Sequence, residues 1–370
     1  MVIGFDGSKA FRKRKTGVEA YSYQLLLHLS KIDHNNTYKI FLDPRVNEMP
    51  IEKWPANFQF KVLSWPFMWT QLGLAWQTYV GGLDLLFETA HSLPLLKNPK
   101  LKSLITVHDL GAEYLGTMHQ IKQRLYLGLM TRYQLKFADK IIAVSKSTKR
   151  DIIARARIPA NKIEVVYEGF DEGLFKETVP KINIFKQFDI EKGNYFLFVG
   201  TIQPRKNLHR LIEAYIETYG TVHDSPKLVL AGGKGWLSDP IYRHVYTFGL
   251  QSRIKFTGFL SNDQLVELYK NALAFVFPSL FEGFGLPILE AFSFGVPVIT
   301  SDISSMPEVV GEAALLVDPY DVSDIGKAMK KIRSDPKLRK TLVQKGKVRR
   351  QKFSWKKSAE ETLVIMEKMA

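Results

Sequence analysis

Short apolar segments, each bounded by turn-forming residues, recur along the chain. They include KSLITVHDL, DKIIAVSKS, YFLFVGTI, PKLVLAGGKG, LAFVFPS and PVITSD. Stretches with apolar residues at helical spacing, such as LHRLIEAYIETYG and NDQLVELYKNA, lie between them. Buried strands that alternate with helices are typical of parallel sheets covered by helices on both faces. The pattern therefore predicts an α/β protein.

The alternation pauses between about residues 168 and 194, where Gly, Pro and charged residues follow no sustained period. A segment of this kind is typical of a linker between domains. A chain of 370 residues also exceeds the usual size of one hydrophobic core. We therefore predict two Rossmann-like domains that face each other across a cleft, residues 1–172 and 190–353.

The most apolar long stretch of the chain covers residues 65–87. Its length approaches the ~20 residues that span a bilayer. It also contains Gln71, Gln77 and Asp84, which favour an amphipathic helix over 67–80 that leads into a buried strand. A membrane-spanning helix and peripheral contact with a membrane remain as alternatives.

The charge of the chain indicates an anionic partner. Lys and Arg total 52 against 37 Asp and Glu, and residues 330–357 hold thirteen basic side chains with Asp335 as the one acid. Nucleic acid, a membrane surface and a phosphorylated small molecule are all possible partners, and a solvated basic face explains the same excess. The chain has no cysteine, which excludes disulfides and thiolate nucleophiles. Its first residues lack the apolar core of a signal peptide, so we expect a cytoplasmic location.

A glycine-rich loop in FPSLFEGFGLPILEAF carries the first candidate site. Phe284, Gly285 and Leu286 are expected at the N-terminus of a helix, where backbone N–H groups favour a phosphate. Glu282 and Glu290 flank this loop, and a carboxylate can accept hydrogen bonds from the hydroxyls of a sugar. A sugar nucleotide would satisfy both features. A loop acid and an acid in the first turn of a helix explain the spacing equally well.

A second candidate cluster is Arg205 and Lys206, in the loop of FVGTIQPRKNLHRLIEAY. This loop follows an apolar strand and precedes a helix, and ligands of open α/β sheets bind at that edge. Lys206 can act as a point charge on a diphosphate, and Arg205 as a planar fork. A loop with solvated basic residues is the alternative.

These segments resemble the retaining family-four glycosyltransferases of the GT-B fold, whose signature is two Glu separated by seven residues, here Glu282 and Glu290. The resemblance extends through AGGKGW, FTGFLSNDQLVELYKNA, GVPVITSDISSMPEVVGEAALLVDPYD and FSWKKSAEETL, which is nearly the whole C-terminal half. It implies that Glu290 binds the nucleotide ribose, Glu282 contacts the donor sugar and Lys206 neutralises the diphosphate. It also implies that a C-terminal helix over 354–370 crosses back to the first domain.

The chain departs from the family at one position. Many members carry Arg directly after the glycine that ends the strand, where this chain has Thr201. Arg205 is a candidate to serve in place of that Arg.

The N-terminal half offers further candidates. ITVHDLGAEYL places His108 and Asp109 at the end of a buried strand. The resemblance implies that His108 contacts the transferred sugar, with Asp109 as the next candidate, and that His91 faces the acceptor. Gly17 resembles the loop glycine whose backbone approaches the donor phosphates. A structural histidine is the alternative for His108.

The resemblance implies a retaining hexosyltransferase that needs no metal or other cofactor. Similarity to bacterial mannosyltransferases of surface-polysaccharide assembly makes GDP-mannose the first choice of donor, and a glycan or lipid-linked hydroxyl the expected acceptor. Contact with an anionic membrane, at its inner face, is a further expectation. An epimerase or phosphorylase of the same fold is an alternative. A basic nucleic-acid-binding protein is another, although no nucleic-acid-binding motif is recognisable and nucleic acid is not the expected partner.

Overall fold

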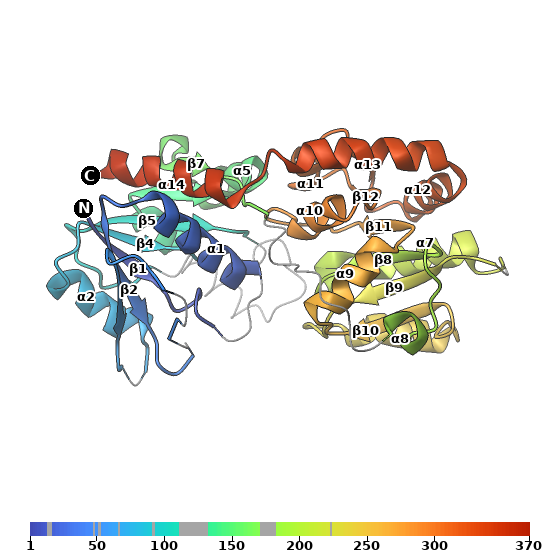
Figure 1. Cartoon of the computed structure of the whole chain (residues 1–370), viewed down its shortest axis with the longest axis horizontal. Coiled ribbons are helices and arrows are strands. Elements are labelled where there is room, and N and C mark those ends of the chain that lie inside the picture. Colours follow the sequence, from blue (N-terminus) through green and yellow to red (C-terminus); the bar gives the residue numbers. More distant parts are fainter. Residues whose placement is uncertain are drawn as a thin grey trace. The chain divides into compact units, whose positions relative to one another are not determined.

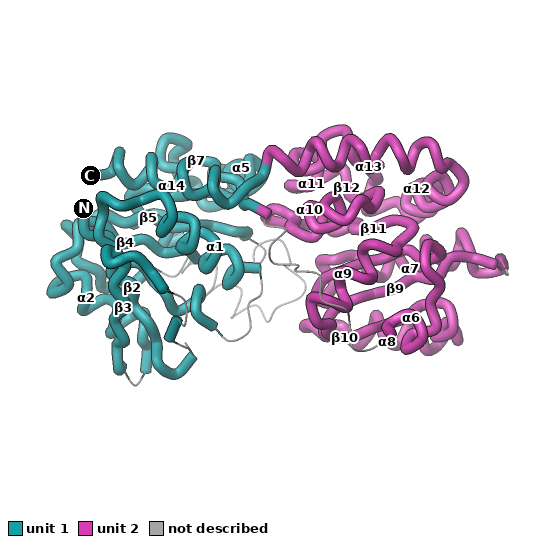
Figure 2. Tube along the Cα trace, in the orientation of Figure 1, with its two compact units in different colours: residues 1–169, 353–370 teal, residues 170–352 magenta. Residues whose placement is uncertain are grey.

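The computed structural model divides the chain into two compact units. Unit 1 consists of Met1–Gly169 and Phe353–Ala370, and unit 2 of Phe170–Lys352 (Figure 2). Unit 1 is thus assembled from two separate pieces of the chain. The structure describes residues 1–12, 17–46, 49–50, 53–65, 67–90, 93–110, 132–170, 183–222 and 224–370.

Unit 1 is built on a seven-stranded sheet with the strand order β3-β2-β1-β4-β5-β6-β7. Neighbouring strands are parallel throughout. The strands are β1 (Val2–Asp6), β2 (Thr37–Leu42), β3 (Phe58–Val62), β4 (Leu85–Glu88), β5 (Lys102–Val107), β6 (Lys140–Ala143) and β7 (Ile163–Val165). Their apolar side chains form the core, and β1, β4, β5 and β6 are buried almost throughout.

The helices of unit 1 include the C-terminal one. Those that the structure describes from end to end are α1 (Gly17–Ile32), α2 (Ala75–Val80), α5 (Lys146–Ala156) and α14 (Trp355–Met369), with short helical turns η1 (Thr70–Leu74) and η2 (Ala160–Lys162). Helix α14 lies beside α1 (Figure 1), and the Trp355 and Tyr21 rings meet edge to face with centroids 5.6 Å apart. Ser354 caps α14 by accepting a hydrogen bond from the Lys357 amide.

Unit 2 repeats the architecture with a six-stranded parallel sheet in the order β10-β9-β8-β11-β12-β13. Its strands are β8 (Tyr195–Val199), β9 (Lys227–Ala231), β10 (Ile254–Gly258), β11 (Ala274–Phe277), β12 (Val298–Ser301) and β13 (Ala314–Val317). Its helices are α6 (Ile184–Gln187), η4 (Pro204–Lys206), α7 (Leu208–Tyr219), α8 (Asp239–Thr247), α9 (Asn262–Lys270), α10 (Leu286–Ser293), α11 (Met306–Val310), α12 (Val322–Ser334) and α13 (Pro336–Arg350) (Figure 1). Two parallel sheets with alternating helices confirm the predicted α/β fold class.

The helix predicted over 67–80 is wrong in its extent. Met68 has a left-handed φ of 47°, which an α-helix does not tolerate, so the helical backbone begins later. A π-helical turn, η1, comes first, and regular α-helix is confined to α2. Among the residues that the structure describes, no helix is long and apolar enough to cross a membrane.

Candidate active site

The candidate site of unit 2 is formed by the loops that follow β8 and β11. These two strands are neighbours in the sheet, so their carboxyl ends bring the two loops together. The Leu280 amide donates a hydrogen bond to the Arg205 carbonyl at 2.9 Å, which joins the loops directly. Asn207, at a left-handed φ of 59°, donates from Nδ2 to the carbonyls of Pro278 and Pro319 at 3.0 and 2.6 Å.

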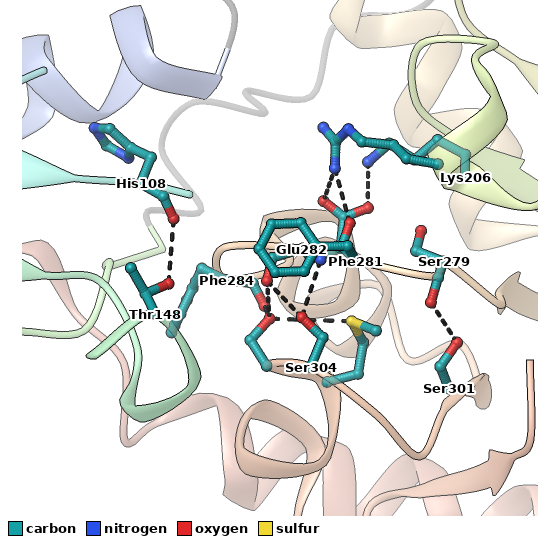
Figure 3. A network of polar contacts seen from close by, with 12 residues as sticks. His108, Thr148, Lys206, Ser279, Phe281, Glu282, Phe284, Ser301 and Ser304 are labelled. Atoms are coloured by element: carbon teal, nitrogen blue, oxygen red, sulfur yellow. Dashed lines mark hydrogen bonds and ion pairs between the residues drawn. The ribbon is translucent and has the colours of Figure 1, made fainter. Parts of the chain in front are cut away.

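Glu282, in the loop after β11, binds both basic residues of the loop after β8 (Figure 3). Its Oε2 accepts from Arg205 Nη1 at 2.7 Å, and its Oε1 accepts from Lys206 Nζ at 2.5 Å. Arg205 also donates to the Phe281 carbonyl at 3.0 Å, and the Lys206 ammonium lies 4.8 Å from the centre of the Phe277 ring. We call Arg205, Lys206 and Glu282 the charge cluster. It places two cations and one carboxylate at the carboxyl edge of the sheet.

The charge cluster is withdrawn from solvent. The side chains of Lys206 and Glu282 are 7% and 8% exposed, so the alternative of a solvated basic side chain does not hold for Lys206. Burial alone would raise the pKa of Glu282, but the charges and hydrogen bonds of Arg205 and Lys206 lower it to about 2. Glu282 is therefore ionised at neutral pH. Its contribution to stability is present above pH ~4.5 and is lost as the pH falls toward 2.

Two serines hold the loop that carries Glu282. Ser304 Oγ donates to the Glu282 carbonyl at 2.8 Å and accepts from the Glu282 amide at 3.1 Å. Ser305 Oγ lies 2.9 Å from the Phe284 carbonyl and 3.0 Å from the Glu282 carbonyl. The loop conformation is thus fixed from the segment after β12.

Helix α10 starts where this loop ends. Gly285 precedes it with φ 109°, a conformation that disfavours a side chain, and Leu286 is the first helical residue. The helix therefore begins one residue before Pro287, whose fixed φ suits the first turn. Phe284 is buried, at 3% exposure. The N-terminus of α10, an end that favours anions, directly follows the loop of Glu282.

Glu290 lies on α10 and is half-buried. Its Oε2 accepts a hydrogen bond from the hydroxyl of the buried Tyr269 at 2.8 Å. Burial raises the pKa of Glu290 to about 7, although the Tyr269 hydrogen bond acts in the opposite direction. Because the unfolded chain loses this proton first, the stability that Glu290 contributes falls as the pH rises from about 4.5 to about 7.

The candidates of unit 1 lie at the carboxyl edge of its sheet. His108 follows β5, and its ring is held by the Glu168 carboxylate and the Thr89 carbonyl. The His108 carbonyl accepts from Thr148 Oγ1 at 3.3 Å (Figure 3). Asp109 is half-buried beside it.

Two further candidates of unit 1 came from the sequence. A Cβ atom added at Gly17, the first residue of α1, would meet no other atom within 4 Å, so the space beside it is open. His91 lies outside the residues that the structure describes.

Several residues of these sites were not predicted. Glu168 stood at the start of the segment interpreted as a linker, and Tyr269 looked like a core aromatic of a helix. Ser304 and Ser305 had no local signal, because their partners lie about twenty positions away in the sequence. Within the described part of the chain, no three His, Cys, Asp or Glu side chains group closely enough to hold a metal ion.

Comparisons with known proteins agree with this geometry. Residues 180–349 match the family described as "Glycosyl transferases group 1", and residues 15–174 match "Glycosyltransferase Family 4". The O-antigen chain mannosyltransferase B of Escherichia coli is 30% identical over 263 residues, which cover 71% of this chain and 69% of that protein. The chain is a family-four glycosyltransferase.

Two other comparisons place this glycosyltransferase among known proteins. It is 31% identical to the serotype-specific mannosyltransferase WbdA of Escherichia coli over 271 residues, 71% of this chain but only 33% of that longer protein. Its fold is similar to that of a sucrose-phosphate synthase from Thermosynechococcus elongatus, with a TM-score of 0.76 at 21% identity, over 100% of this chain and 99% of that one. The predicted GT-B fold is thereby confirmed.

Family membership indicates the class of substrate. A glycosyltransferase takes its sugar from a nucleotide-sugar donor and adds it to a glycan acceptor. The charge cluster offers cations to an anionic group, and the carboxylates offer acceptors to sugar hydroxyls. The site of unit 2 therefore contains the residue types that such a donor requires.

Proposed function

We propose that this glycosyltransferase moves mannose from GDP-mannose to a hydroxyl of a glycan or lipid-linked acceptor, with retention of the anomeric configuration. The observation that carries the proposal is the charge cluster, whose Glu282 lies in the loop directly before the N-terminus of α10. The choice of mannose is supported by two relatives, both of which are named mannosyltransferases. The choice of a retaining reaction rests on the resemblance to family four.

In the proposed reaction the bond between the anomeric carbon and the diphosphate oxygen breaks, and its electron pair stays on the diphosphate. Lys206 and Arg205 stabilise the charge that grows there. The acceptor oxygen bonds to the anomeric carbon from the same face, and its proton passes to the departing diphosphate oxygen. Glu282 holds both cations and contacts the donor sugar, and Glu290 accepts hydrogen bonds from the ribose.

Unit 1 is proposed to contribute the acceptor side. His108, directly after β5, is assigned to the transferred sugar, and Asp109 beside it is a candidate for the acceptor side. His91 is assigned to the acceptor. The backbone at Gly17, where the space is open, is assigned to the donor phosphates.

Ranking donors tests the proposal. In a thermal-shift screen with every sugar nucleotide at the same concentration, one present at a hundred times its dissociation constant adds about 2.7 kcal/mol of stability, and a weaker binder adds less. We expect GDP-mannose to give the largest shift among GDP- and UDP-linked sugars, with free mannose as the control. A larger shift with a UDP-sugar would refute the donor assignment, and an inverted linkage in the product, read by NMR, would refute retention.

We further propose that unit 1 contacts an anionic membrane that presents the acceptor. This is supported by six large apolar side chains, four of them aromatic, that are 37–60% exposed; we call them the aromatic surface: Trp65, Phe67, Met68, Trp76, Tyr79 and Val80. A Cβ atom added at Gly73 would meet the Trp65 side chain, so Trp65 packs against η1, which leads directly into α2. Lys61 Nζ donates to Gln77 Oε1 at 3.0 Å, which places a cation beside α2. Amphipathic aromatic side chains beside cations suit the boundary of anionic lipid.

The aromatic surface predicts vesicle binding that depends on lipid charge. The chain is expected to sediment with vesicles of phosphatidylcholine and phosphatidylglycerol, less with phosphatidylcholine alone, and less in high salt. Trp76→Ser with Tyr79→Ser should weaken binding at least about tenfold, because two apolar surfaces are lost. Tyr246→Ser, at an exposed tyrosine of unit 2, is the matched control. Unchanged binding of the double variant would rule this surface out.

A further inference from the structure

The ring of His108 lies between two hydrogen-bond acceptors. Its Nδ1 is 3.0 Å from Glu168 Oε1, and its Nε2 is 2.9 Å from the Thr89 carbonyl oxygen. A carboxylate and a backbone carbonyl have no proton to give. Both ring nitrogens must therefore donate, and only the imidazolium form of histidine carries two N–H groups.

The surroundings of the ring stabilise the imidazolium form of His108. Glu168 and His108 have side chains that are only 7% and 12% exposed, so water does not compete strongly for either group. Burial lowers the pKa of His108, but the hydrogen bond and charge of Glu168, the Thr89 carbonyl and the charge of Asp109 raise it above the ordinary value. Among the residues that the structure describes, Tyr21 of α1 is a further titratable group against the ring, and the two rings meet edge to face with centroids 4.6 Å apart.

These contacts join three strand ends. His108 follows β5, Thr89 follows β4, and Glu168 lies beyond β7. Thr89 is itself fixed from α1, because its Oγ1 is 2.6 Å from Ser22 Oγ. Rotation of the ring would break a buried hydrogen bond, so its orientation is fixed.

We propose that Glu168 is a positioning residue for glycosyl transfer, which locks His108 as an oriented imidazolium across the strand ends of unit 1. The inference rests on the proposed function in so far as His108 serves the transferred sugar. The imidazolium form also limits what His108 can do in the reaction. A ring with no lone pair cannot take the proton of the acceptor hydroxyl, so this proton must leave by another group, and the departing diphosphate oxygen is available.

The protonation state of His108 can be measured without any substrate. In ¹⁵N NMR of the wild-type chain at pH 7.5, both ring nitrogens of His108 are expected to be protonated, with the signals assigned by their loss in His108→Gln. A neutral tautomer at that pH overturns the proposal. Because no donor is needed, this result stands even if GDP-mannose is the wrong donor.

The positioning role is tested with Glu168→Gln. Glutamine keeps a hydrogen-bond partner for the ring but removes the negative charge, so His108 should become neutral near pH 8. We expect kcat at pH 8 to fall at least about tenfold, with the donor KM within about twofold of wild type, and to recover partly toward pH 6 as the ring regains its proton. Glu164→Gln, at an exposed acid of β7, is the control and should match wild type.

Two outcomes overturn the positioning role. One is a wild-type kcat for Glu168→Gln across pH 6–8. The other is a loss of kcat that is the same at every pH, which would mark Glu168 as structural only. If the variant does not fold, the ¹⁵N measurement on the wild-type chain still decides the protonation state.

Discussion

Replacement of Glu282 by alanine is expected to destabilise unit 2 by about 3–5 kcal/mol. The substitution removes the carboxylate shared by Arg205 and Lys206 and leaves two neighbouring cations. The Lys206 side chain is 7% exposed, so water cannot replace the lost partner fully. Repulsion between the cations adds to the loss.

Denaturant unfolding of the full chain measures this effect. Glu312→Ala is the control, because Glu312 also pairs with a lysine, Lys345, but its side chain is 88% exposed. An exposed pair contributes about 1 kcal/mol or less. If Glu282→Ala lowers the free energy of unfolding by less than about 1 kcal/mol, the charge cluster is not a buried ion-pair network, and this account is contradicted.

Replacement of Lys206 by alanine is expected to lower kcat by about 10²–10³. Glu282 and the adjoining loop hold the Lys206 ammonium before the donor arrives. Such a preorganised cation stabilises the charge that appears on the leaving diphosphate and needs no rearrangement during the reaction. The variant should remain more stable than Glu282→Ala, because Arg205 still pairs with Glu282.

Steady-state kinetics with the correct donor separate the two possible roles of Lys206. Lys340→Ala, at an exposed lysine of α13, serves as the control and should keep wild-type kinetics. If Lys206→Ala keeps a wild-type kcat and only raises KM, the lysine binds donor and transition state equally. Its assignment to the leaving group would then be wrong.

The fold could be predicted because its signals are local. A buried parallel strand shows as a short apolar run, and an amphipathic helix as a periodic one, so each element is visible in its own residues. The exposed helix of unit 1 was the exception. Its apolar side chains Trp76 and Tyr79 face solvent, and only the backbone at Met68 reveals where the helix cannot extend.

The candidate site could be predicted only in part. Lys206 and Glu282 were found because each sits in a loop after an apolar strand. Their direct contact was not predicted, since it depends on β8 and β11 being neighbours in the sheet. Glu168 was missed because a single acid beside a glycine has no periodic signal, and its partner His108 lies sixty positions earlier.

Titration of GDP-mannose into the full chain at pH 8 and pH 6 tests the central claim, that unit 2 binds a nucleotide sugar through Glu290 and the charge cluster. The diphosphate of GDP-mannose is esterified at both ends and does not titrate between pH 6 and pH 8. Since the pKa of Glu290 is about 7 and ribose hydroxyls favour the ionised form, we predict 1:1 binding that weakens about tenfold at pH 6. Glu290→Gln should bind more weakly at pH 8 and lose this pH dependence. Binding of GDP-mannose that is equal at both pH values and unchanged in the variant, or absent altogether, would contradict the account.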